Sequence, residues 1–240
     1  MKFEDYSRTF LHFHTTEIPP ILRRHLSIDQ SALLDLGAGD GNLLVSLQAA
    51  GLLDSFDKLV AVDISEQRCD RLREYTEFSV ICADATNVSE LESSSFDLVL
   101  CTQVIEHVDE QSLLREISRL LKPGGIAYIA SIIRKKYGWW YYRTADGRWA
   151  LDPTHLREYE SADQYEGVIR SGGFEILETV TTSFKLSIIE FVLRRVIIPV
   201  FQPRNIHSIF IKHPFADWIR QNFNIHPPGY HVVETIAKRP

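Results

Sequence analysis

The chain has 240 residues, of which 45% are hydrophobic, 24% charged and 11% aromatic. These values are ordinary for a globular protein, and they exclude a disordered, collagen-like or coiled-coil chain. The formal net charge is −6, but residues 184–240 carry +5 whereas residues 1–183 carry −11. We therefore expect any anionic partner to bind the C-terminal part of the chain.

The cysteines and the apolar segments indicate in which cellular compartment the protein is expected. Cys69, Cys82 and Cys101 form no CxxC pair, and the last two end apolar strand-like runs, which predicts core side chains in a reducing compartment. The N-terminus lacks the apolar region of a signal peptide, and no window reaches 18 uninterrupted apolar residues. We expect a cytoplasmic protein.

Short apolar runs alternate with amphipathic segments through the first half of the chain. The runs are continuous rather than alternating, as in a parallel sheet that helices cover on both faces. The pattern predicts a doubly wound α/β fold. Strands are expected at 32–36, 58–63, 78–82, 96–102 and 126–133, and helices at 42–50, 65–75 and 109–121, the last stopped by Pro123-Gly124-Gly125.

The sequence changes character after the fifth strand. Residues 134–160 are rich in Trp and Tyr. They suit either a lid over a flat, lipid-like or sugar acceptor, or side chains that pack the lid onto the sheet or form a dimer interface. A helix at 161–171 and strands at 174–182 and 230–237 follow. The expected organisation is N-terminal cover helices at 1–30, a cofactor-binding core at 31–183 with the lid insert at 134–160, an insertion at 184–228, and a final core strand at 229–240.

Three alternating glycines, Gly37, Gly39 and Gly41, follow Asp35 at the turn from the first strand to the first helix. Without Cβ atoms the backbone can turn sharply and touch a ligand, and the helix N-terminus offers unpaired N–H groups. Asp63 ends the second strand, where a carboxylate can accept hydrogen bonds from both hydroxyls of a ribose. Together they predict a site for a nucleotide-like cofactor.

The glycine spacing separates two classes of cofactor. A nicotinamide dinucleotide site needs G-x-G-x-x-G, which is absent, and Asp40 would repel a pyrophosphate. The D-x-G-x-G-x-G pattern instead resembles motif I of class I S-adenosylmethionine-dependent methyltransferases. Ala83-Asp84-Ala85, FDLVLCTQVIEHV and LLREISRLLKPGG resemble later motifs of that family. The resemblance covers residues 31–133, with a weaker match at 155–182, and implies a Rossmann-like fold with a mostly parallel seven-stranded sheet.

The resemblance also implies S-adenosyl-L-methionine as the cofactor and assigns nine residues to it. They are Asp35, Gly37 and Gly39 at the methionine side, Asp63 at the ribose, Ile64, Asp84 and Ala85 at the adenine, and Thr102 and Gln103 beside the sulfonium.

Two histidines are candidate bases for methyl transfer to a small-molecule acceptor, which we expect to be methylated on oxygen. His107 follows the fourth strand, where the family builds the floor of the substrate site, and His155 follows the aromatic insert. For each of them, a purely structural histidine is the competing interpretation.

A metal-dependent mechanism is a sharper alternative. Glu106-His107 with a later histidine resembles the metal site of small-RNA 2′-O-methyltransferases, in which two glutamates and two histidines bind a divalent ion. Here Gln103 stands in place of one glutamate, and the acidic body repels RNA. We therefore predict no metal and no nucleic acid. RNA 2′-O-methylation and a protein that binds S-adenosylmethionine without catalysis are the alternative functions.

The segment 184–204 is apolar and carries +3. Such a segment can lie on a lipid surface. Certain quinone-biosynthesis methyltransferases, which this chain resembles in its core, carry a membrane-touching insertion in the corresponding region. A buried lid helix and a homodimer contact are the competing interpretations.

Overall fold

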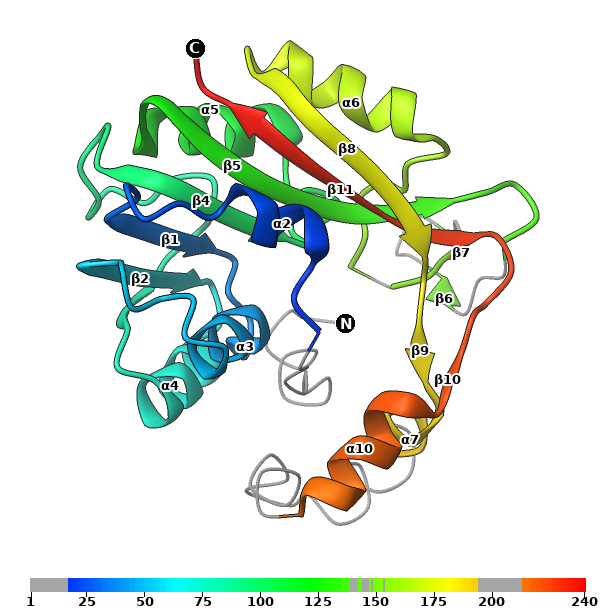
Figure 1. The fold of residues 1–240 in the computed structure, drawn as a ribbon. Helices are drawn as coiled ribbons and strands as arrows, with labels where there is room; N and C mark the ends of the chain where they lie inside the picture. Colours follow the sequence, from blue (N-terminus) through cyan, green and yellow to red (C-terminus); the bar gives the residue numbers. More distant parts are fainter. Residues whose placement is uncertain (1–16, 139–141, 144–146, 148, 153, 194–212) are drawn as a thin grey trace.

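The computed structural model describes residues 17–138, 142–143, 147, 149–152, 154–193 and 213–240. Its centre is a seven-stranded sheet with the order β3-β2-β1-β4-β5-β11-β8 (Figure 1). Strand β11 runs antiparallel to both neighbours, and the other neighbouring strands pair in parallel. The strands are β1 (Ala32–Leu36), β2 (Lys58–Asp63), β3 (Ser79–Cys82), β4 (Phe96–Thr102), β5 (Leu121–Arg134), β8 (Glu175–Ser183) and β11 (Tyr230–Lys238). The predicted doubly wound, mostly parallel sheet is confirmed.

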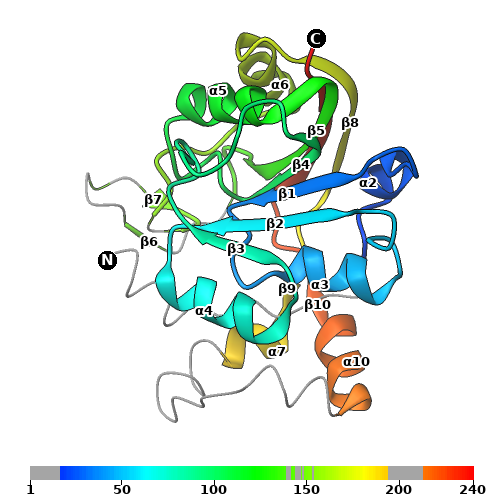
Figure 2. The ribbon, with the colours of Figure 1, turned by 90° about the vertical axis from the view of Figure 1, so that its left-hand side faces the viewer.

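Helices cover both faces of this sheet (Figures 1 and 2). On one face lie α2 (Pro20–His25), α3 (Asn42–Ala49) and α4 (Glu66–Tyr75), and on the other α5 (Glu110–Leu120) and α6 (Ala162–Ser171). Leu33 and Leu34 are adjacent in β1 yet belong to the two different core clusters, because successive strand side chains point to opposite faces. Both faces are buried, which explains why the strands read as continuous apolar runs.

One boundary was predicted wrongly. Pro123-Gly124-Gly125 does not lie in a turn between helix and strand, because α5 ends at Leu120 and β5 begins at Leu121. The register of β5 against β4 shifts here, since Phe96 pairs with Leu121 but Leu98 pairs with Ile126. The three residues thus form a bulge within β5, a place where a strand tolerates proline and glycine.

A lobe is inserted between β8 and β11, within the predicted insertion 184–228. Its described residues, 184–193 and 213–229, form β9 (Leu186–Ser187), α7 (Ile188–Val192), α10 (Pro214–Asn222) and β10 (Asn224–Ile225). Strands β9 and β10 pair antiparallel. The lobe leaves the sheet at the carboxyl ends of the parallel strands, because Ser183 pairs with His231 and Tyr230 pairs with Arg134 at the end of β5 (Figure 1).

The lobe has charge inside and aromatic side chains outside. Arg220 of α10 is 1% exposed and donates to Glu190 of α7 and to Asp217, both at 2.6 Å. Phe215 and Trp218 of the same helix are 73% and 56% exposed, and their rings stack with centroids 6.3 Å apart. Further large apolar side chains of the lobe are exposed: Ile188, Phe191, Val192, Phe223 and Ile225.

Parts of three predicted regions lie outside the described residues. Of the predicted N-terminal cover, 1–30, the structure describes residues 17–30 with α2, which packs against β11. In the predicted lid, 134–160, β6 (Tyr142–Arg143) and β7 (Trp149–Ala150) form a small antiparallel hairpin, while 139–141, 144–146, 148 and 153 are not described. Of the apolar basic segment 184–204, residues 194–204 are not described.

Candidate active site

The glycine loop connects β1 to α3. Gly37, Gly39 and Gly41 all have left-handed backbone conformations, with φ of 83°, 59° and 77°. A Cβ on Gly37 would lie 2.2 Å from Val104, which follows β4, so a side chain there would also push the loops apart. The sequence therefore needs glycine at these positions for backbone geometry and for close packing at the carboxyl edge of the sheet.

Asp63 lies at the end of β2 beneath this loop, where the sequence predicted it. Its carboxylate accepts from the N–H of Gly39 at 2.8 Å and from that of Ser65 at 2.9 Å. The buried guanidinium of Arg68, on α4, lies 3.8 Å away. Burial raises the pKa of Asp63, against the lowering effects of Arg68 and the two N–H donors. Asp63 is therefore tied to the glycine loop and stands next to the ligand position that the loop defines.

Asp35, predicted for the methionine side, lies in β1 and is buried. Its Oδ1 has no hydrogen-bond partner among the described residues. Burial, and to a lesser degree the charge of Asp63, raises its pKa to about 7. A buried carboxylate without a donor is satisfied by a cation, and the ammonium and sulfonium groups of S-adenosylmethionine are cations. The residues present therefore fit this cofactor.

The predicted adenine side is formed by the ends of β2 and β3. Ile64 is 52% exposed and offers an apolar surface to a flat ring. One carboxylate oxygen of the exposed Asp84 accepts from the N–H and hydroxyl of Thr86, both at 2.8 Å, which fixes the orientation of that carboxylate. Ala85 is buried behind it.

Thr102 ends β4 and Gln103 follows it, on the sulfonium side of the predicted site. Gln103 has a φ of 56°, and its N–H donates to Ala130 of β5. This left-handed residue turns the chain sharply away from the sheet, which directs the next segment, Val104–Val108, across the edge where the glycine loop lies.

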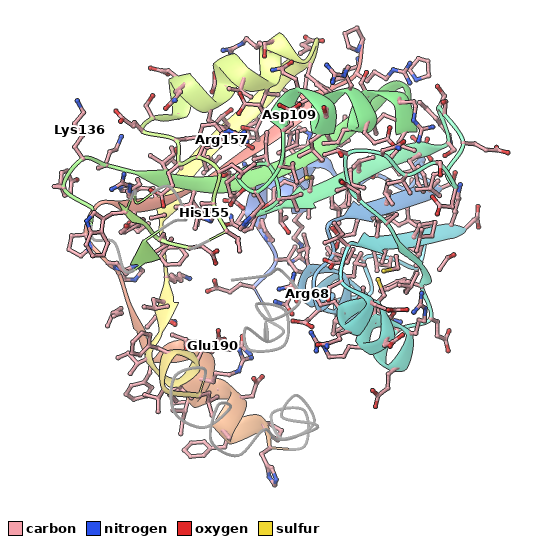
Figure 3. The ribbon with its side chains drawn as sticks, turned by 180° about the vertical axis from the view of Figure 1, so that it is seen from behind. Arg68, Asp109, Lys136, His155, Arg157 and Glu190 are labelled. Carbon is pink, nitrogen blue, oxygen red and sulfur yellow. The ribbon has the colours of Figure 1, made fainter. Side chains whose placement is uncertain are left out.

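The two predicted catalytic histidines come from different segments that are bound to each other. The backbone N–H of Leu156 donates to the carbonyl of Glu106 at 2.9 Å, and the guanidinium of Arg157 donates to the carbonyls of Ile105 and Val108. Figure 3 shows His155 and Arg157 together on the segment before α6, with Arg68 at the same edge of the sheet. These bonds bring His155 to the loop that carries His107.

Glu106, His107 and His155 form one cluster, with one ligand atom from each lying within 4.8 Å of the others. The imidazole rings meet edge to face, with centroids 4.7 Å apart. The carboxylate of Glu106 is buried, and its own backbone N–H and the hydroxyl of Ser131 act on it as hydrogen-bond donors that lower its pKa. Three groups that can all accept protons therefore converge in a buried space.

Hydrogen bonds on the far side of each ring decide which nitrogen faces the cluster. The Thr154 hydroxyl donates its one proton to Asp152 at 2.5 Å, so it accepts from Nδ1 of His107 at 2.9 Å. Nδ1 of His155 lies 3.3 Å from the carboxylate of Glu158. In both rings Nδ1 is thus occupied, and Nε2 is the nitrogen available to the cluster.

The two histidines differ in charge. Burial, followed by repulsion from His155, lowers the pKa of His107 to about 4. Burial also acts to lower the pKa of His155, but its bond to Glu158 and the charges of Glu106 and Asp152 outweigh this and raise it. Burial raises the pKa of Glu106, against the opposing charge of His155. At neutral pH His107 is therefore neutral, and His155 is the more basic of the two imidazoles.

Sequence reasoning missed three contributors. Arg68 beside Asp63, the Asp152–Thr154 pair behind His107, and Glu158 behind His155 were not predicted as site residues. Asp152 and Thr154 stand next to His155 in the sequence but orient the distant His107, so their position carried no local signal of this role.

Residues 34–129 match the family model described as a methyltransferase domain. A ubiquinone biosynthesis O-methyltransferase from Neisseria meningitidis is 29% identical over 115 residues, which are 45% of this chain and 47% of that protein. The biotin biosynthesis bifunctional protein BioHC of Cellvibrio japonicus is 26% identical over 167 residues, which are 66% of this chain and 30% of that protein. The chain thus spans about half or less of these two curated relatives.

Solved structures show the same fold. A putative methyltransferase from Bacillus halodurans superposes with a TM-score of 0.62 at 16% identity, covering 92% of this chain and 96% of that one. The [4+2]-cyclase SpnF superposes with a TM-score of 0.59 at 20% identity, covering 92% and 79%.

The glycine loop with Asp63, the order of the seven strands and the matched model together define a class I S-adenosylmethionine-dependent methyltransferase domain within this chain. Its cofactor is S-adenosyl-L-methionine. In the part of the chain that the structure describes, no helix has the length and apolarity needed to cross a membrane.

Proposed function

We propose that this methyltransferase methylates a hydroxyl oxygen of a small molecule, with His107 as the general base. The observation that carries the proposal is the fixed tautomer of His107, whose Nδ1 is bound to Thr154 so that an unprotonated Nε2 faces the cluster. The names of the curated relatives, which include O-methyltransferases, support oxygen as the acceptor atom.

S-adenosylmethionine supplies a methyl group on a cationic sulfur, which leaves as a neutral thioether. The acceptor O–H gives its proton to His107 Nε2 as the oxygen attacks. In its protonated form, which the raised pKa favours, His155 is held by Glu158 and stabilises the negative charge that develops on the oxygen. Glu106 offsets the second positive charge that arises when His107 is protonated.

The low pKa of His107 restricts the acceptor. A base with a pKa of about 4 takes a proton efficiently only from an acidic hydroxyl that a neighbouring cation stabilises. Phenols and catechols therefore fit better than aliphatic alcohols.

The test is release of S-adenosylhomocysteine with a panel of phenols, catechols and aliphatic alcohols. We expect His107→Gln to lower kcat by about 10²–10⁴-fold, with the affinity for S-adenosylmethionine unchanged. His155→Gln should remove the loss of activity on the alkaline side of the pH profile, where wild-type His155 deprotonates. Full kcat in His107→Gln would refute the assignment.

A metal-assisted mechanism is the second candidate, and one observation favours it. The cluster supplies a carboxylate and two imidazoles whose outer nitrogens are held by Glu158 and Thr154, as metal-binding histidines are held. A divalent ion would replace the proton of His155 and bind the acceptor oxygen. If EDTA abolishes activity and Mn²⁺ or Zn²⁺ restores it, the metal interpretation replaces the acid–base one.

We also propose that the lobe contacts an anionic lipid surface. Its exposed aromatic side chains and a net charge of +4 in residues 184–228 support this partner. A homodimer through the same face would bring two such charges together. We expect co-sedimentation with vesicles that contain anionic lipid but not with neutral ones, and a loss of binding in Phe215→Ser/Trp218→Ser. A dimer in light scattering that this double variant dissociates would contradict the proposal.

A further inference from the structure

Two of the three cysteines lie side by side at the adenine edge of the cofactor site. Cys82 is the last residue of β3, is exposed, and pairs with Asp63 across the sheet. Cys69 is buried on α4. The sequence predicted Cys82 as a core residue, and this is wrong: β3 ends there, and the side chain reaches solvent.

Strand and helix periodicity explain why the two residues meet. Val80 and Cys82 are two apart in β3 and share the face that α4 covers, where Val80 packs against the cluster that contains Leu72. Cys69 precedes Leu72 by three residues on the same side of α4. Helix α4 runs antiparallel to β3. Cys69, which lies one turn before Leu72 on the helix, is therefore next to Cys82, which lies two residues after Val80 on the strand.

The contacts agree with this placement. The thiol of Cys69 donates to the carbonyl of Asp63 at 3.4 Å and lies 3.8 Å from that of Ile81. The sulfur of Cys82 lies 3.7 Å from the carbonyl of Ile64. Cys82 is also among the groups that raise the pKa of Cys69, as a thiol close to it would do. The third cysteine, Cys101, belongs to the core cluster on the opposite face of the sheet.

We propose that Cys69 and Cys82 are a modification site at which a hydroperoxide forms a reversible disulfide that weakens cofactor binding. The exposed Cys82 thiol loses its proton and its thiolate attacks the peroxide; the O–O bond breaks, a sulfenic acid forms, and the departing hydroxide takes up that proton and leaves as water. The sulfur of Cys69 then displaces the sulfenic hydroxyl, which leaves as a second water. Two thiols and one hydrogen peroxide thus give one disulfide and two waters.

Burial explains the order of these steps. It raises the pKa of Cys69 to about 12, so this thiol stays protonated and shielded from the oxidant until Cys82 has reacted. A thiol exposed beside a protected partner is the arrangement of a redox-sensing pair.

The disulfide would act on the cofactor site through the backbone. Sulfurs in van der Waals or hydrogen-bond contact must close to about 2.05 Å with a restricted dihedral angle, so the end of β3 and the start of α4 must move together. These segments carry Ile64 and Asp84, and the Cys69 thiol is bonded to the carbonyl of Asp63. Moving them misplaces the predicted partners of the ribose and the adenine.

The experiment uses the full chain and needs no acceptor, so its outcome does not depend on the proposed O-methylation. The protein is treated with hydrogen peroxide, free thiols are alkylated, and the disulfide is located by peptide mass spectrometry. Binding of S-adenosylhomocysteine is measured by calorimetry. We expect oxidation to raise Kd about tenfold or more, as the loss of one charge-assisted hydrogen bond would, and dithiothreitol to restore it.

Cys82→Ser, at an exposed position, and Cys69→Ala should each abolish the effect of peroxide on Kd. Cys101→Ser is the matched control and should keep that effect. If Cys69→Ala does not fold, Cys82→Ser alone decides. The proposal is overturned if no Cys69–Cys82 disulfide forms, if it forms with Kd unchanged, or if Cys82→Ser responds as wild type does.

Discussion

The sheet and the lobe bury opposite kinds of side chain. The sheet places Leu and Val between its helices, and three of the buried acids of this part of the chain, Asp35, Asp63 and Glu106, lie at one edge. The lobe buries Arg220 with its two acid partners and leaves Phe215 and Trp218 in solvent. Apolar burial holds the sheet together, whereas directional bonds hold the lobe, so the two regions should respond differently to the same kind of change.

Arg220→Ala should have the largest effect, and it should be confined to the lobe. Removing the arginine leaves Glu190 and Asp217 without their buried partner, which costs about 3–5 kcal/mol. Hydrogen exchange should accelerate in α7 and α10 but not in β1 or β4, and the affinity for S-adenosylmethionine should be kept. Arg170→Ala, which breaks the exposed pair with Glu166, is the control and should cost less than about 0.5 kcal/mol.

Leu98→Ala tests the sheet in the same way. Leu98 is fully buried in β4, so the truncation should cost about 3 kcal/mol through lost burial and the cavity left behind. Denaturant unfolding should show this loss for the whole sheet. If the loss equals that of an exposed control such as Leu156→Ala, the centre of the sheet is not packed as described.

The pH dependence of stability also distinguishes the sheet from the lobe, because the edge of the sheet contains an acid with a raised pKa. The pKa of Asp35 is raised from 3.8 to about 7 in the folded chain, so the folded state binds the proton more tightly than the unfolded state. This contribution to stability is therefore present below about pH 4 and is lost as pH rises towards 7.

The free energy of unfolding of Asp35→Asn should not fall as pH rises towards 7, because this variant has no carboxyl group to ionise at that position. The difference in unfolding free energy between the variant and the wild type should therefore grow with pH, by at most a few kcal/mol. For the same reason, cofactor affinity in the wild type should increase as pH rises through 7, because the ionised carboxylate suits a cation. Identical curves for the two proteins would contradict the burial of this acid.

Trp218→Ser should have the smallest effect on folding, below about 0.5 kcal/mol, because the side chain is largely exposed. Thermal unfolding measures it, with Tyr165→Ser, a fully buried aromatic on α6, as the contrasting variant. A large loss for Trp218→Ser would mean that this side chain packs against the chain itself rather than facing solvent.

Local chemistry explains what the sequence could predict. The strands appear as apolar runs because both faces are covered, and Gly37, Gly39 and Gly41 stand out because left-handed turns need glycine. Asp63 follows from its place at the end of β2. In each case the signal lies within a few residues of the feature itself.

The features that the sequence could not predict depend on contacts between segments that are distant in the chain. Nothing near His107 or His155 shows that Arg157 binds the carbonyls of Ile105 and Val108 and so brings the two rings together. Likewise, the pattern of α10 shows that the helix has an apolar and a polar side, but not that the apolar side faces outward.

The connection between β8 and β11 has a further consequence. These strands are antiparallel neighbours whose ends, Ser183 and His231, face each other, so the whole lobe occupies the position of a hairpin turn. Loop length adds only slowly to the entropic cost of joining two such ends. The catalytic sheet can therefore accept lobes of different size at this junction without rebuilding its own core. Exchange of the segment between Ser183 and Tyr230 would thus change what the chain presents at this end of the sheet and leave the sheet itself as it is.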